Sequence, residues 1–162
     1  MSDPVLDPET DTAEIMRRLL SEEWNEDEVD KPDIFRLKTE DEDGTPKKNV
    51  DPQANEYLLF SEVDERNEDY GDPGRHTVNF DYSCFAEFAT IHGRDRREEV
   101  YKEVRRICRK NNSRRRAEDV LGEPLGAWDT LNHNATVPDE DLFDFWVIEW
   151  TFGFSAVSRT VV

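Results

Sequence analysis

The sequence predicts an α+β fold, in which an antiparallel or mixed sheet of about four to five strands carries an N-terminal helix and a second amphipathic helix. Two segments in the middle of the chain predict it. Residues 76–91 alternate between apolar and polar side chains at period two, as in a long strand with one buried face. Residues 94–112 follow at once and carry an apolar stripe at helical spacing, which indicates an amphipathic helix of about sixteen residues ending at Asn111-Asn112.

The N-terminal part of the chain holds the other predicted helix and two shorter strands. Apolar side chains recur at helical spacing from Ala13 to Trp24, with Asp11 or Thr12 as the N-cap. Short strands are expected within residues 33–40 and 56–63. Residues 1–11, which are acidic and contain two prolines, are interpreted as a flexible lead, and 12–162 as a single domain. Polar loops are expected at about 40–54, 64–75 and 112–140. The second is expected to join two antiparallel strands, and the third to hold one short strand at about residues 128–132.

The C-terminal segment is aromatic and strand-like. Its apolar alternation changes phase between Val147 and Ile148, which predicts a β-bulge at that point. The core is expected to form where these strands face the two helices, through Phe80, Tyr82, Phe88, Trp150 and Phe152.

The composition is strongly acidic. Asp and Glu number 39 against 21 Lys and Arg, for a net charge of −18, and arginine far outnumbers lysine. Such chains resemble the proteins of extreme halophiles, in which strong salt screens the self-repulsion. No apolar run approaches the length of a membrane-spanning helix, and no signal peptide is expected. Cys84 and Cys108 are interpreted as buried thiols of an intracellular protein.

Chemical motifs are missing from the sequence. No histidine pair stands at metal-binding spacing, and there is no phosphate-binding loop, dinucleotide fingerprint, nucleophile elbow or H-E-x-x-H. We therefore expect no catalytic residue, metal ligand or cofactor, and we do not expect an enzyme. Carboxylates are so abundant that sequence alone does not single out a catalytic pair among them.

One compositional anomaly stands against the acidic background. Residues 94–116 hold eleven lysines and arginines and four acids, a net charge of +7. Three interpretations are open: phosphate binding, a protein contact, or arginines balanced by neighbouring acids of the same chain. The protein contact is favoured, because an acidic protomer with one basic surface is self-complementary in a head-to-tail ring. The residues expected to form this assembly surface are Arg105, Arg109, Arg114, Arg115 and Arg116.

The order of elements resembles that of the tail-completion or tail-terminator proteins, which join head and tail in tailed viruses. The resemblance covers about residues 13–162 and is carried by a long strand, a short turn and the helix within "GRDRREEVYKEVRRICRKNN", followed by a loop and an aromatic C-terminal strand. It implies a non-enzymatic virion protein that forms a hexameric ring, closes the tail tube and binds connector proteins. With the acidic composition, it implies an archaeal tailed virus of a halophilic host, with the ring assembled in the host cytoplasm.

The implied partners are other copies of the chain, the tail-tube protein and the connector. DNA would pass through the ring without sequence-specific binding, and no membrane partner is expected. Two alternatives from other classes remain open: a small halophilic enzyme or accessory subunit with a carboxylate-based site, and a nucleic-acid-binding protein that acts through its arginines.

Overall fold

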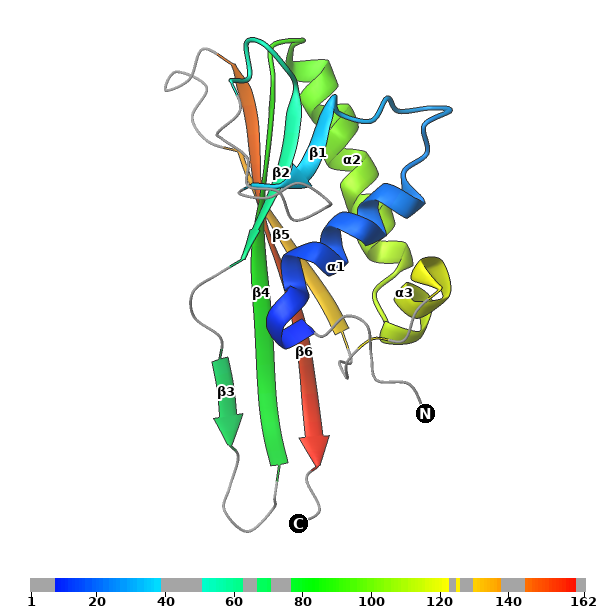
Figure 1. The fold of residues 1–162 in the computed structure, drawn as a ribbon, viewed down its shortest axis with the longest axis vertical. Coiled ribbons are helices and arrows are strands. Elements are labelled where there is room, and N and C mark those ends of the chain that lie inside the picture. The colour runs from blue at the N-terminus through cyan, green and yellow to red at the C-terminus, as the bar shows by residue number, and fades with distance from the viewer. Residues whose placement is uncertain are drawn as a thin grey trace.

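The fold is α+β, with helices covering one face of a mixed sheet (Figure 1). The computed structural model describes residues 8–38, 51–62, 67–70, 77–122, 125, 130–137 and 145–159. The described elements are α1 (Pro8–Glu23), β1 (Ile34–Leu37), β2 (Tyr57–Glu62), β3 (Asn67–Tyr70), β4 (Thr77–Thr90), α2 (Arg94–Lys110), α3 (Arg114–Leu121), β5 (Thr130–Thr136) and β6 (Trp146–Arg159). None of these helices is long and apolar enough to span a membrane.

The sheet is five strands wide, in the order β1-β2-β4-β6-β5. Strand β3 also pairs with β4, next to the half of β4 that β2 leaves uncovered, so β2 and β3 succeed each other along one side of β4. Only the β1–β2 pair is parallel among the described strands. The predicted fold class is confirmed, as is the antiparallel pairing of the strands that flank residues 64–75.

The main core lies between the sheet and the helices. Alternate side chains of β4 and β6 are buried there, because successive residues of a strand point to opposite faces. The members from these two strands are Cys84, Ala86, Phe88, Ile148, Trp150, Phe152 and Phe154. Of the predicted core, Phe88, Trp150 and Phe152 are confirmed and Tyr82 is buried, while the side chain of Phe80 lies outside the described residues. Both cysteines are buried free thiols, as predicted.

The predicted β-bulge is wrong. Strands β4 and β6 pair one-to-one from Thr77 opposite Arg159 to Thr90 opposite Trp146, with no extra residue. The change of phase has a different cause, because both faces of β6 are apolar at this end. Ile148 points into the main core, whereas Val147 points to the other face and joins a small second cluster with Tyr57, Leu59 and Ala89.

The predicted flexible lead is too long. Residues 1–7 lie outside the described part, but residues 8–11 already belong to α1. The helix is kinked at Asp11, whose φ of −122° and ψ of 28° are not helical, and its apolar pattern begins only after the kink. Glu62 of β2 accepts a hydrogen bond of 2.8 Å from the backbone N–H of Ala13, next to the kink, as an N-capping side chain does.

The predicted loop at 112–140 is also wrong, because it contains α3, and β5 is longer than the short strand expected at residues 128–132, which it overlaps. The Oγ of Ser113 accepts a hydrogen bond from the Arg116 backbone N–H, and Gly122, with a φ of 68°, ends the helix in a left-handed conformation. Ala117 buries the inner side of α3, which packs against α1. Likewise, β3 lies within the predicted loop at 64–75. Residues 40–50 of the remaining loop at 40–54 lie outside the described residues.

Part of the sheet extends beyond the helices. In the lower half of Figure 1, β3 and the paired ends of β4 and β6 continue past α1 and α3. We call this three-stranded extension the arm. Its existence follows from strand length, since β4 and β6 each contain 14 residues.

Candidate functional site

The predicted assembly residues lie on two helices. Arg105 and Arg109 are on the second half of α2, and Arg114, Arg115 and Arg116 form the first turn of α3. All but Arg105 are exposed, and the Arg105 guanidinium lies 5.3 Å from the centroid of the Tyr101 ring. We refer to these five arginines as the arginine surface.

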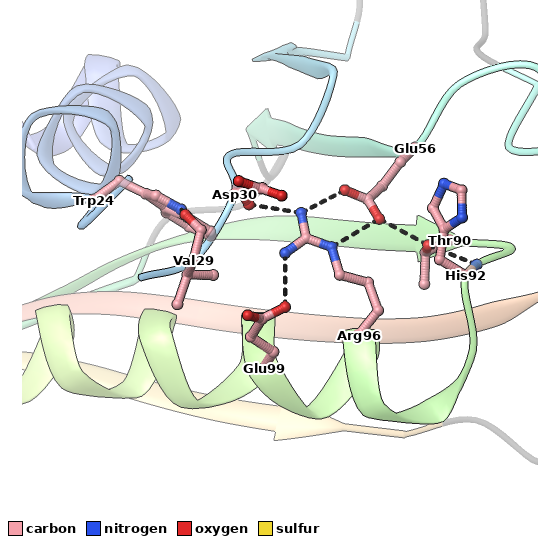
Figure 2. Close-up of polar contacts among 8 residues, drawn as sticks. All are labelled: Trp24, Val29, Asp30, Glu56, Thr90, His92, Arg96 and Glu99. Carbon is pink, nitrogen blue, oxygen red and sulfur yellow. Dashed lines mark hydrogen bonds and ion pairs between the residues drawn. The ribbon is translucent and has the colours of Figure 1, made fainter. Parts of the chain in front are cut away.

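Other arginines of the basic segment are used inside the protein, and Arg96 is the clearest case (Figure 2). Its guanidinium binds both carboxylate oxygens of Glu56, with Nη2 2.6 Å from Oε1 and Nε 2.9 Å from Oε2. It also donates to the backbone carbonyl of Asp30 at 2.6 Å and to Glu99 at 3.1 Å. The Thr90 hydroxyl also donates a hydrogen bond of 2.7 Å to Glu56. Helix α2 is thereby tied to β2, β4 and the segment before β1.

The Arg96–Glu56 pair is shielded from water, with side-chain exposures of 12% and 5%. Burial by itself would raise the pKa of Glu56, but the hydrogen bonds from Arg96 and Thr90 outweigh it and hold that pKa below its ordinary value. Glu56 is therefore a carboxylate that stays charged in the folded protein. This arrangement ties α2 to the sheet and supports the fold.

Further basic residues pair with acids of the same chain. Arg106 contacts Glu103 at 2.6 Å, and Lys110 contacts Glu23 of α1 at 2.9 Å. Arg114, a member of the arginine surface, contacts Glu118 one helical turn later at 3.2 Å. The interpretation as internally balanced arginines therefore holds for these residues.

Arg109 and Arg115 are different. Both are exposed, and neither has a carboxylate partner among the described residues. Arg109 and Arg105 lie close enough to His133 of β5 to act on its titration. Partial burial first, and then these two positive charges, lower the pKa of His133. The arginine surface thus continues from α2 toward the edge strand of the sheet.

A second candidate lies on the opposite face of the sheet, which none of the described helices covers (Figure 1). A pocket of about 370 Å³ opens there. Its lining includes Lys38, Leu59, Phe85, Glu87, Glu149 and Thr151. We call it the acidic pocket.

Two carboxylates stand side by side in the acidic pocket, since Glu87 of β4 is paired directly with Glu149 of β6. Like charges in such cross-strand positions repel each other. Burial first, and then the charge of Glu149, raise the pKa of Glu87, while Lys38 and a hydrogen bond from Tyr57 act in the opposite direction. Burial and the proximity of Glu87 also raise the pKa of the Tyr57 hydroxyl.

This pair was not singled out by the sequence. Glu87 occupies a polar position of the long alternating strand, and Glu149 a polar position of the last strand. The alternation places each on the outer face, but it does not say which residues lie opposite each other. The described residues contain no group of three His, Cys, Asp or Glu side chains that could hold a metal ion. Chemically, the acidic pocket suits a cationic group flanked by apolar surface.

Comparison with known proteins does not extend these observations. No family model matches the chain, and no curated protein matches it.

Proposed function

We propose that this chain is a structural subunit that assembles with copies of itself into a ring, at the head–tail junction of a tailed virus of a halophile. In this proposal the ring closes the tail tube and binds the connector. Hexameric order and these neighbours are what the resemblance to tail-completion proteins implies. The proposal needs no catalytic chemistry.

The observation that carries the proposal is the arm. β4 and β6 pair along their full lengths, yet the helices pack over only part of that surface (Figure 1). An extension of paired strands that none of the described helices covers is suited to contacts outside its own subunit. The face of the sheet that none of the described helices covers adds exposed apolar surface, since Phe85, which lines the acidic pocket, is 48% exposed.

The proposal is tested by measuring the mass of the full-length protein in molar KCl with light scattering after size exclusion, and by negative-stain microscopy of the same fractions. We expect a closed ring several times the 19.0 kDa of one chain. A protein that stays monomeric at tens of micromolar, in both low and molar salt, would rule out self-assembly as proposed.

A second candidate, an enzyme or accessory subunit with a carboxylate-based site, is favoured by one observation. Glu87 combines a raised pKa with a position in the lining of a pocket, as a general acid requires. A thermal-shift screen of small cationic and sugar ligands tests it. A ligand that stabilises the wild type and loses its effect in Glu87→Gln would support this candidate, and a screen without such a ligand would leave the assembly proposal preferred.

A further inference from the structure

We propose that the acidic pocket receives arginine side chains from the arginine surface of a second copy of this chain, with Arg109 and Arg115 as the principal donors. This inference rests on the proposed assembly and names the contact that would propagate it. Its starting point is that one protomer carries both a pair of adjacent carboxylates and two exposed arginines without a carboxylate partner among the residues that the structure describes.

The lining of the acidic pocket includes two carboxylates, Glu87 and Glu149, but only one described basic residue. Glu87 and Glu149 face each other across adjacent strands, and among the described residues Lys38 is the one basic residue in the pocket lining. A guanidinium placed between the carboxylates would relieve their repulsion and form charge-assisted hydrogen bonds with both. Arginine suits this position better than lysine, because its planar fork can bind more than one carboxylate oxygen at a time.

The surroundings of the acidic pocket also suit arginine. Phe85 is 48% exposed and lines the same pocket as the two carboxylates. A guanidinium can stack on an aromatic face while its N–H groups reach nearby carboxylates. Leu59 and Thr151, which also line the pocket, can contact the aliphatic part of the side chain.

The arginine surface supplies positive charges that could complement the acidic pocket. Arg109 and Arg115 are exposed, and no carboxylate among the described residues is paired with either. They are carried by helices that pack on the face of the sheet opposite to Glu87 and Glu149. The sheet therefore separates these arginines from the acidic pocket of their own chain, and the pairing requires a second copy.

The placement of the two surfaces also sets the kind of assembly. A contact between the helical side of one protomer and the open sheet face of the next is heterologous, or head to tail. Repetition of such a contact gives a ring if the rotation closes. Charge complementarity therefore favours a second copy as the occupant, in a geometry that agrees with the proposed ring.

The test uses two variants of the full-length chain in molar KCl. Glu149→Arg spoils the acidic pocket and leaves the arginine surface intact, whereas Arg109→Ser combined with Arg115→Ser does the reverse. We expect each variant alone to dissociate, with the dissociation constant raised on the order of thirtyfold or more. Asp27→Arg, at an exposed position in the turn after α1, changes the net charge by the same amount as Glu149→Arg and should assemble as the wild type does.

Mixing the two variants gives the decisive result. An equimolar mixture should form a one-to-one heterodimer and nothing larger, because the intact arginine surface of one variant meets the intact pocket of the other. This outcome also shows that both variants fold. A mixture that stays monomeric, or a Glu149→Arg variant that assembles like the wild type, overturns the pocket contact while leaving the ring possible. A monomeric wild type overturns the assembly proposal itself.

Discussion

Replacing Arg96 by alanine should destabilise the protein far more than an arginine substitution on the surface of the same helix. The guanidinium makes two hydrogen bonds with Glu56, and one each with Glu99 and the Asp30 carbonyl. The Glu56 side chain is only 5% exposed in the wild type, and without Arg96 it keeps, among the contacts described above, only that from Thr90. Removing one partner of a buried ion pair costs about 3–5 kcal/mol, because the other charge is left without compensation.

The measurement is urea-induced unfolding in molar KCl, since guanidinium chloride would change the ionic strength together with the denaturant. Arg94→Ala is the matched control, because Arg94 is exposed and stands two residues earlier on α2. Its effect should be about 0.5 kcal/mol or less. The double variant Glu56→Leu with Arg96→Met should recover most of the loss, because it removes both buried charges. Equal losses in Arg96→Ala and Arg94→Ala would refute the reasoning.

Acidification supplies a second readout of the same pair. The hydrogen bonds from Arg96 and Thr90 outweigh burial and lower the pKa of Glu56 in the folded protein, whereas the pKa of an unfolded glutamate is about 4.3. The stabilisation is therefore fully present above about pH 4.3 and is lost as the pH falls through the lowered folded pKa. The difference in unfolding free energy between the wild type and Arg96→Ala should narrow in that range. A difference that stays constant down to acid unfolding would contradict the assignment.

Three other predictions concern salt, core and surface. The melting temperature, followed by circular dichroism, should rise markedly from low salt to molar KCl because the net charge of −18 needs screening, and a flat profile would remove the halophile argument. Phe88→Ala should lower the free energy of unfolding in urea by about 3–5 kcal/mol, because Phe88 is fully buried. Phe85→Ala, on the opposite face of the same strand, should lower it much less, because Phe85 is 48% exposed. Equal losses would show that the buried face of β4 is assigned wrongly. Changing Arg114–Arg116 together to serine should leave the melting temperature nearly unchanged, because the three are exposed. The same triple change should abolish assembly, as measured by light scattering. A variant that assembles normally would show that the first turn of α3 faces solvent and makes no assembly contact.

The elements that sequence reasoning found are those whose burial repeats at a regular period. The long strand β4 and the helix α2 each carry that period over several turns or pleats, so the sequence predicts which face of each element is buried. Short elements gave weaker signals. Helix α3 spans only 8 residues and buries one side chain fully. Its signals, the Ser113 N-cap and Gly122 after its last turn, lie inside a polar segment whose composition predicts a loop.

The candidate site divides in the same way. The sequence singles out Arg105, Arg109 and the three arginines of α3 because basic residues are concentrated there. It does not show which arginines of the segment form ion pairs with acids of the same chain. Arg96 binds Glu56, which is forty residues away in the sequence, and Glu87 lies opposite Glu149 on the adjacent strand. By itself, the sequence determined the buried faces of β4 and α2, because periodicity is a local property of the chain, but not those of β6, where both faces are apolar at one end. Only the tertiary structure decided which charges are neutralised and which remain exposed, because strand register and helix docking bring together residues that no local pattern connects.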